Sequence, residues 1–369
     1  MKVSRFAIRS SVLVGFSTAA LLVAYSTPAV AATWVVDNDF ADCPQADFNS
    51  IQLAVAAALP GDKILVCPGT YAESVLVNKD DLRIEAQAAP GDVILQGTPA
   101  QQFGFHLLNT SGVLVQGFTV QQYRIGILVE TGSANTVRKN VTTANEIGIE
   151  VFNSAANVVE QNISFNNTGV RFPGVFVAGP QSIANIVRHN EAFGNDIGVG
   201  AITAGRGNVL FGNRAYANRN NGILNAMGSH GTVIENNHSF ENGLAGIAIV
   251  GSTEVTARNN RSEKNTDGIR LANSSAINLV EKNEIFQNTQ DGILLQTNVD
   301  ANTVQLNLVR SNGRDGIRIF DPASNGNRIE RNVMRENVEH DAHDDGTANV
   351  WIDNKCETED QPGLCKNPF

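Results

Sequence analysis

Aromatic residues and positive charge are both scarce in this chain. Phe, Trp and Tyr make up 6% of the 369 residues, and only two of them are tryptophans. Lysine and arginine total 27 against 37 aspartates and glutamates, so the formal net charge is −10. Nucleic acids and anionic lipid surfaces both bind basic faces. We therefore expect neither as a partner, and a polyanionic substrate would need a local group of arginines or a metal ion.

Long apolar runs are also lacking, with one exception near the N-terminus. Three basic residues open the chain, an apolar stretch covers residues 11–25, and Ala29-Val30-Ala31 supplies a small-x-small cleavage signal. This order is typical of a secretory signal peptide, here residues 1–31, and no later run is long enough for a membrane span. We expect a secreted or periplasmic protein whose folded domain occupies residues 32–369.

Cysteine is limited to four residues, which lie in two pairs near the ends of the chain: Cys43 with Cys67, and Cys356 with Cys365. In an oxidising compartment each pair is expected to form a disulfide that closes a short loop and contributes ~2–4 kcal/mol. A metal site is the alternative, but no Cys-x-x-Cys spacing favours it.

A repeat of about 23 residues fills the chain between these pairs. A glycine followed by an apolar residue recurs at Gly104, Gly126, Gly148, Gly169, Gly198, Gly222, Gly246, Gly268, Gly292 and Gly316. One asparagine series keeps the same period, at Asn140, Asn162, Asn190, Asn213, Asn237, Asn260, Asn283, Asn307, Asn332 and Asn354. A second series lies five residues after the first nine of these.

Each repeat contains short β-prone pieces separated by asparagine and glycine, with nothing periodic enough for a helix. A unit this short buries its apolar side only by stacking on its neighbours, so the repeat predicts a parallel β-solenoid of about ten coils. Asparagine and glycine tolerate the left-handed backbone of the turns, and aligned asparagine side chains can hydrogen-bond along the stack. A partial aromatic series keeps the same period, and we favour interior packing for it over a sugar-stacking stripe; its members are Phe165, Phe193, Tyr216, Phe240 and Phe286.

Both ends of the repeat have the character of caps. Residues 48–59 form an Ala-rich amphipathic segment with Asn49 or Ser50 as its N-cap, which predicts a helix over the first coil. The last coil has unpaired backbone N–H and C=O groups on its outer edge, to which another chain could add. We expect the Cys356–Cys365 loop to cover this edge. We assign residues 32–62 to the N-terminal cap, about 63–355 to the coils and 349–369 to the C-terminal disulfide cap.

The chain resembles a known superfamily from residue 34 to residue 365. Its opening, SIQLAVAAALPGDKILVCPGTYAESVLVNKDDLRIEA, its NxxxxN…DGI coils and its ending, NVWIDNKCETEDQPGLC, resemble proteins of the pectin-lyase-like superfamily. The resemblance implies an all-β fold, a single-stranded right-handed parallel β-helix with an N-terminal capping helix. The superfamily includes pectate lyases, polygalacturonases, alginate epimerases, adhesins and NosD-type periplasmic proteins that assist copper-enzyme assembly. Fold alone does not select among these.

Three aspartates, Asp267, Asp291 and Asp315, occupy the same position in successive repeats. Carboxylates stacked at strand spacing repel one another, and a bound Ca²⁺ would relieve the repulsion. The alternative is turn chemistry at an Asp-Gly step, with Arg270 and Arg318 pairing on a solvated face.

The densest group of candidate catalytic or metal-binding residues is His340, Asp341, His343 and Asp344, where the glycine pattern first fails. Two histidines among carboxylates could bind a transition metal or supply a general base. The alternative is a polar final coil that faces water.

The repeat that begins at Gly169 is longer than its neighbours. Insertions in solenoids tend to form loops on a binding face, which makes Arg171, Phe172 and Phe176 candidate ligand-binding residues. A tolerated surface loop is the alternative.

Two functions remain open from the sequence. The first is a secreted β-helix that binds or modifies a polysaccharide, in the manner of a uronate lyase, epimerase or hydrolase. The alternative is a non-enzymatic extracytoplasmic solenoid, either an adhesive scaffold or a NosD-like metal-handling protein. We expect a monomer in either case.

Overall fold

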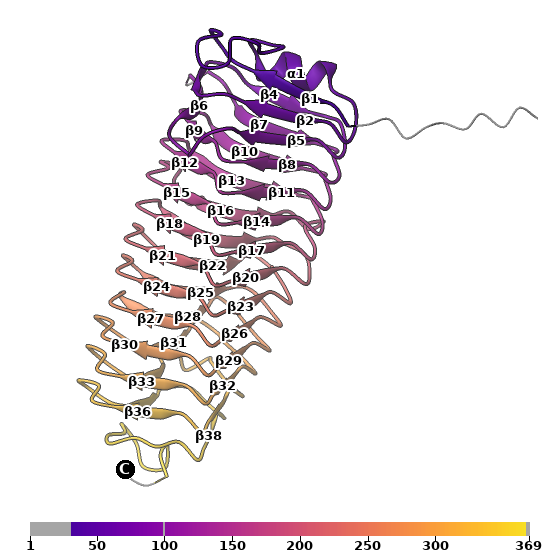
Figure 1. The fold of residues 1–369 in the computed structure, drawn as a ribbon. Helices are drawn as coiled ribbons and strands as arrows, with labels where there is room; N and C mark the ends of the chain where they lie inside the picture. The colour runs from indigo at the N-terminus through magenta and orange to yellow at the C-terminus, as the bar shows by residue number, and fades with distance from the viewer. Residues whose placement is uncertain (1–30, 99, 367–369) are drawn as a thin grey trace, which may run out of the picture. The chain divides into compact units, whose positions relative to one another are not determined.

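The computed structural model describes residues 31–98 and 100–366. They form one unit, an all-β parallel solenoid of about twelve coils with one short helix (Figure 1). The predicted signal peptide lies outside the described residues except for Ala31. The part of the chain that the structure describes contains no helix both long and apolar enough to cross a membrane.

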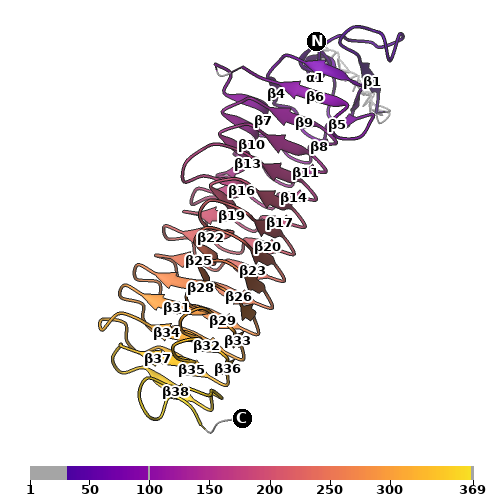
Figure 2. The same ribbon diagram turned by 90° about the vertical axis from the view of Figure 1, so that its left-hand side faces the viewer.

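Each coil supplies one strand to each of three sheets, and every strand pairs in parallel with its equivalent in the next coil (Figures 1 and 2). Sheet A comprises β1 (Thr33–Val36), β2 (Lys63–Val66), β5 (Arg83–Ala86), β8 (Leu114–Gln116), β11 (Thr136–Arg138), β14 (Val158–Glu160), β17 (Ile186–Arg188), β20 (Val209–Phe211), β23 (Val233–Glu235), β26 (Thr256–Arg258), β29 (Leu279–Glu281), β32 (Thr303–Gln305), β35 (Arg328–Glu330) and β38 (Val350–Ile352).

Sheet B comprises β3 (Gly69–Tyr71), β6 (Val93–Gln96), β9 (Thr119–Gln121), β12 (Val141–Thr143), β15 (Ile163–Phe165), β18 (Glu191–Phe193), β21 (Arg214–Tyr216), β24 (His238–Phe240), β27 (Arg261–Glu263), β30 (Glu284–Phe286), β33 (Leu308–Arg310) and β36 (Val333–Arg335). Sheet C comprises β4 (Val75–Val77), β7 (Phe103–Leu108), β10 (Ile125–Glu130), β13 (Ile147–Phe152), β16 (Pro173–Ala178), β19 (Ile197–Ile202), β22 (Ile223–Ala226), β25 (Ala245–Val250), β28 (Asp267–Ala272), β31 (Ile293–Gln296), β34 (Ile317–Ile319) and β37 (Ala342–Asp344).

The expected number of coils is slightly low. Sheet C has strands in twelve coils, whereas the glycine series counts ten. The two additional strands are β4 and β37, at the ends of the sheet, and neither has the glycine-apolar pair. Helix α1 (Ile51–Ala57) lies against β4, and Glu359 of the terminal loop bridges to Ala342 of β37, so each end strand lies between a coil and a cap instead of between two coils.

The core is a column of apolar side chains inside the coils. In nine of the ten repeats the apolar residue that follows the glycine points inward and is fully buried, for example Ile127, Ile149 and Ile223. One member of the glycine series is wrong: Val175, not Val170, pairs with Ile149. The insertion places Val170 in a loop, where it is 61% exposed, because four extra residues precede β16.

Asparagine ladders hold the turns of successive coils together. The Asn237 side-chain oxygen accepts from the backbone N–H (2.8 Å) and the side-chain amide (3.0 Å) of Asn213. Its own amide donates to the Leu210 carbonyl (2.8 Å). Both predicted series form such ladders, and a third, which the sequence analysis missed, precedes sheet A at Asn135, Asn157, Asn185, Asn208, Asn278, Asn302 and Asn327.

The aromatic series lies on the outer face of sheet B, so the expectation of interior packing is wrong. On β15 the buried side chain is Ser164, and Phe165 points the other way. Phe193, Tyr216 and their neighbours stack face to face at centroid distances of 4.8–5.1 Å. Because the rings cover one another's faces, they leave only edges to solvent and do not form a platform for sugar rings.

The two disulfides join Cys43 to Cys67 and Cys356 to Cys365, the pairing expected from the sequence. The helix α1 (Ile51–Ala57) lies against β1, β2 and β4, and the Ser50 hydroxyl accepts from the Leu53 N–H (3.3 Å) as its N-cap. It is only seven residues long.

Candidate functional site

Most of the predicted polar residues lie close together at the start of the sheet C strands in the last coils. Asp267, Asp291 and Asp315 occupy one column, and His340 follows in the next coil, since Ile317 pairs with Ala342. All three aspartates are at least 98% buried. The repeat therefore stacks three buried carboxylates and ends the stack with an imidazole.

The three carboxylates have separate partners instead of one shared site. Arg314 binds Asp291 through two nitrogens, with its Nε 2.7 Å from the carboxylate. Arg318 donates to Asp315 (3.2 Å). Among the described residues, the groups that could hold a metal ion include Asp315 but neither Asp267 nor Asp291. The arrangement thus favours the Asp-Gly turn interpretation for the first two, and calcium binding by the three together remains an untested expectation.

The imidazole rings of His340 and His343 both lie next to the carboxylate of Asp315. Nδ1 of His340 lies 3.4 Å from its Oδ1, and Nδ1 of His343 lies 3.2 Å from its Oδ2. The two imidazole rings are nearly perpendicular, with centroids 5.4 Å apart. Both Nδ1 atoms are buried, and neither makes a hydrogen bond. Three ligand atoms of a metal-binding kind therefore face one another, all within 4.8 Å.

The other side of the His343 ring faces solvent-accessible carboxylates. Its Nε2 lies 3.2 Å from Asp345 and 3.8 Å from Asp360. Asp345 is itself 3.7 Å from Arg318. His343 thus connects a buried carboxylate on one side to an acidic surface on the other.

Burial controls the charge of the site. Desolvation raises the pKa of Asp315, and the neighbouring Asp291 raises it further, while His343 and Arg318 oppose the rise. A cation at this position would favour the ionised carboxylate, because it would replace lost hydration with direct charge.

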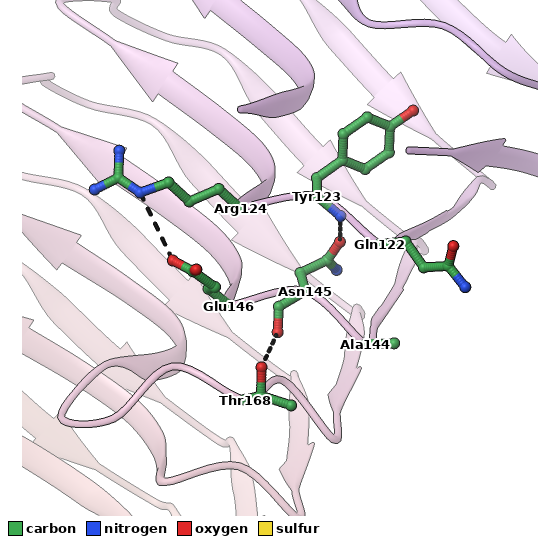
Figure 3. A pocket seen from close by; sticks show the side chains of 7 residues that line it. All are labelled: Gln122, Tyr123, Arg124, Ala144, Asn145, Glu146 and Thr168. Atoms are coloured by element: carbon green, nitrogen blue, oxygen red, sulfur yellow. Dashed lines mark hydrogen bonds and ion pairs between the residues drawn. The ribbon is translucent and has the colours of Figure 1, made fainter. Parts of the chain in front are cut away.

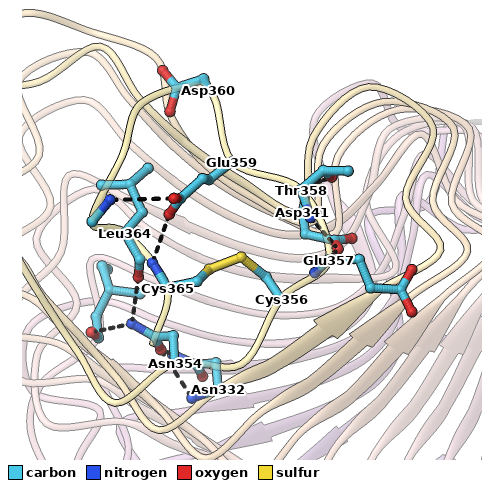
Figure 4. Close-up of a disulfide and its surroundings, with 12 residues drawn as sticks. Asn332, Asp341, Asn354, Cys356, Glu357, Thr358, Glu359, Asp360, Leu364 and Cys365 are labelled. Atoms are coloured by element: carbon cyan, nitrogen blue, oxygen red, sulfur yellow. Dashed lines mark hydrogen bonds between the residues drawn. A yellow bond between two sulfur atoms is a disulfide. The ribbon is translucent and has the colours of Figure 1, made fainter. Parts of the chain in front are cut away.

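Asp341 and Asp344, two of the candidate catalytic residues, are held by structural contacts. Asp341 is 1% exposed and accepts from the Asn337 amide (2.7 Å) and the backbone N–H of Glu357 (2.7 Å), next to the Cys356–Cys365 loop (Figure 4). It therefore terminates an asparagine ladder.

Asp344 accepts from the indole of Trp351 (2.7 Å) and the amide of Asn349 (3.0 Å). These bonds tie β37 to the last strand of sheet A. Neither aspartate lies in the group formed by Asp315 and the histidines.

The three candidate residues of the insertion differ in their contacts with the rest of the protein. Phe176 lies on β16, is 3% exposed, and packs in an outer apolar cluster with Leu128 and Ile147. Phe172 is exposed, and the backbone N–H of Arg171 donates to Asp196 (2.6 Å). Phe176 is therefore part of the packing, while ligand binding by the other two remains an expectation.

A pocket of about 230 Å³ lies at the turns between sheets B and C (Figure 3). Asn145 accepts from the Tyr123 N–H (3.0 Å), and Arg124 pairs with Glu146 at 3.7 Å. Its polar groups are occupied by contacts between coils, so it offers little chemistry of its own.

Solved structures of several other proteins show the same fold. The A-module of mannuronan C-5 epimerase AlgE6 from Azotobacter vinelandii has 16% identity and a TM-score of 0.62, over 85% of this chain and 96% of that one. An alginate lyase from Paenibacillus sp. str. FPU-7 has 15% identity and a TM-score of 0.53, over 76% and 95%. The Dettilon tailspike protein has 15% identity and a TM-score of 0.51, over 74% and 56%. Identities this low show a shared fold alone.

Sequence comparison gives a family. No curated protein matches the chain. The family model described as "Periplasmic copper-binding protein (NosD)" matches residues 75–226 and 224–361, which is most of the solenoid and includes the Asp315–histidine group. The chain therefore belongs to the NosD family of parallel β-helix proteins.

Proposed function

We propose that this protein is an extracytoplasmic metal-handling β-helix that binds a Cu²⁺ ion through Asp315, His340 and His343. One observation carries the proposal: two buried histidine nitrogens face a buried carboxylate and make no hydrogen bond. Buried polar atoms are normally satisfied, and an unpaired one costs about 1–3 kcal/mol. A metal ion between the three atoms would remove that cost.

The spacing of the three atoms fits a metal ion. Two ligand atoms bound at about 2.1 Å lie about 3.0 Å apart at a right angle and about 3.4 Å apart at a tetrahedral angle. Oδ1 of Asp315 is 3.4 Å from Nδ1 of His340, and the other oxygen, Oδ2, is 3.2 Å from Nδ1 of His343. Both separations lie within this range, and one ligand atom from each of the three residues lies within 4.8 Å of the other two.

The ligand types favour copper(II). Imidazole nitrogen and carboxylate oxygen suit divalent copper, nickel and zinc, and copper is bound most tightly within that series. Thiolates, which would favour copper(I), are absent from the described residues, because all four cysteines are in disulfides. The family description, periplasmic copper-binding, agrees with this choice.

Hydrogen bonds from neighbouring groups hold the carboxylate of Asp315 in place. The backbone N–H of His340 donates to Asp315 (3.0 Å), and Arg318 donates to its other oxygen (3.2 Å), so the carboxylate is fixed before an ion arrives. Three protein ligands leave further coordination positions open for water or for a ligand on an acceptor protein. An open position suits a protein that passes an ion on.

Isothermal titration of the apo protein with Cu²⁺, Zn²⁺ and Ca²⁺ tests the proposal. We expect one equivalent of Cu²⁺ to bind, and the His340→Ala/His343→Ala double variant to lose at least 100-fold in affinity. His106 and His238 each face one glutamate at 2.8 Å. The His106→Ala/His238→Ala variant is therefore the matched control and should bind as the parent does. Equal binding by both double variants would refute the proposal.

Action on a polysaccharide remains a prediction, and so does an adhesive role. The fold shared with alginate epimerases, a lyase and a tailspike is compatible with a polysaccharide partner but does not specify one. The metal proposal requires neither.

A further inference from the structure

A second polar site lies on the outer face of sheet C, on the coils just before the histidines. A pocket of about 330 Å³ opens between β28, β31 and the loop around β34. The side chains that give it chemical character are Asp267, Arg270, Leu294, Arg314 and Phe320. None of these five belongs to the proposed metal site.

Arg270 brings a positive charge to the pocket without a direct ion pair. Within the described residues no carboxylate oxygen lies within 4.0 Å of its guanidinium, whereas Arg314, on the opposite wall, is neutralised by Asp291. With the Gln296 amide turned to present its oxygen, Arg270 Nε donates to it over 3.1 Å. A neutral partner positions the guanidinium but leaves its charge available to a ligand.

Asp267 lines the same pocket and is short of partners. It is 2% exposed, and its carboxylate accepts one long hydrogen bond, from the Asp291 N–H (3.4 Å). Desolvation raises its pKa and Asp291 adds to the rise, while the positive charges of Arg270 and Arg314 oppose it. The Asp267 carboxyl therefore has capacity for a hydrogen bond with a polar group of a ligand.

Apolar side chains line another part of the pocket. Leu294, which is 4% exposed, and Phe320, which is 52% exposed, both line it. The pocket thus combines a cation, a hydrogen-bonding carboxyl and apolar contact surface, which is the usual composition of a small-molecule site.

We propose that this pocket binds a carboxylate group of an organic ligand, with Arg270 as its charge partner, Asp267 as a hydrogen-bonding group, and Leu294 and Phe320 against the carbon skeleton. Planar guanidinium groups match carboxylates in shape and charge, which favours this anion over a halide. The carboxylate could belong to a free acid or to a uronate residue of a polysaccharide, and the two differ only in what extends beyond the pocket.

Titration calorimetry with three probes tests the proposal: galacturonate, a galacturonate oligomer and the neutral galactose oligomer of the same length. We expect both acids to bind and the neutral oligomer not to bind. Arg270→Gln should weaken binding at least tenfold, and Arg270→Lys should retain part of it. Arg138 on sheet A also donates from Nε to a glutamine, Gln116 (2.7 Å), so Arg138→Gln is the matched control and should bind as the parent does.

The outcomes separate the two sources of the carboxylate. Tighter binding of the acidic oligomer than of the monomer identifies a polysaccharide, and equal binding identifies a free acid. Absence of binding by every acid, or equal affinity of the Arg270→Gln and Arg138→Gln variants, would overturn the proposal. The His340→Ala/His343→Ala variant should bind the acids normally, so this result stands apart from the metal test.

Discussion

Nδ1 of His343 lies 3.2 Å from a carboxylate oxygen of Asp315, and Nε2 of the same ring lies 3.2 Å from Asp345. One imidazole therefore spans the boundary between a fully buried carboxylate and the acidic surface. Neutral imidazole binds metal through either nitrogen, and the second nitrogen then donates to a carboxylate that fixes the ring. The His343–Asp345 contact supplies that second interaction.

The C-terminal disulfide should support the metal site as well as the fold. The Cys356–Cys365 loop presents the backbone N–H groups of Glu357 and Thr358 to Asp341, which directly follows His340. We expect Cys356→Ser/Cys365→Ser to lower stability by about 2–3 kcal/mol and to weaken Cu²⁺ binding several-fold. Thermal unfolding and copper titration measure the two effects. Cys43→Ser/Cys67→Ser is the control, because that bridge is at the other end of the solenoid. An equal loss of copper affinity in both variants would contradict the link.

Glu150 should make stability depend on pH. It lies on the outer face of sheet C between Leu128 and Phe176, and desolvation there raises its pKa to about 7. The folded state then holds the proton more tightly than the unfolded state. This contribution is complete below the unfolded pKa and is lost as the pH rises through about 7.

Between pH 5 and pH 8 we therefore expect the free energy of unfolding of the Glu150→Gln variant to rise by about 2 kcal/mol relative to that of the parent. The size of the pKa shift of Glu150 sets the upper limit of this difference. Unfolding curves across this pH range measure it. Glu339→Gln, at an exposed position near the other end of the solenoid, should leave the pH profile of the parent unchanged. A parent profile that does not fall with pH relative to Glu150→Gln would refute the assignment.

A single asparagine should be costly to remove from a ladder. Asn237→Ala leaves two donors of Asn213 without a partner inside the protein and removes one hydrogen bond to the Leu210 carbonyl. We expect a loss of about 2–4 kcal/mol, measured by chemical unfolding. The exposed Asn38 makes one weak side-chain bond (3.4 Å), so Asn38→Ala should change stability little. Similar values for the two variants would show that the ladder bonds do not stabilise the stack.

The repeat was predictable because stacking requires the same residue types at every turn. Glycine and asparagine recur where the coils bend, and that periodicity predicts parallel stacking without reference to long-range contacts. It failed at Gly169, where an inserted Gly-Val pair imitates the pattern inside a loop. Periodicity also does not tell whether a side chain points into the core or outward. The outward position of Phe165 follows from the alternation of side chains along its strand, because the neighbouring Ser164 is buried.

The candidate site was predictable only in part. The concentration of histidines and aspartates in one short segment indicated His340 and His343, and the alignment of the repeats indicated Asp315. The sequence therefore assigned the histidines and Asp315 to two different groups. Their meeting depends on the pairing of β34 with β37, where the glycine pattern has ended. The structural role of Asp341 depends on N–H groups of the terminal loop, which no repeat pattern encodes.

Pulsed electron paramagnetic resonance of the Cu²⁺-loaded protein tests the central claim most directly, because it detects the remote nitrogen of each imidazole bound to copper. The account predicts modulation from two coordinated imidazoles. It also predicts modulation from one imidazole in each single variant, His340→Ala or His343→Ala, and from none in the double variant. A spectrum with no imidazole contribution, or one that persists unchanged in the double variant, would contradict a copper site at Asp315, His340 and His343.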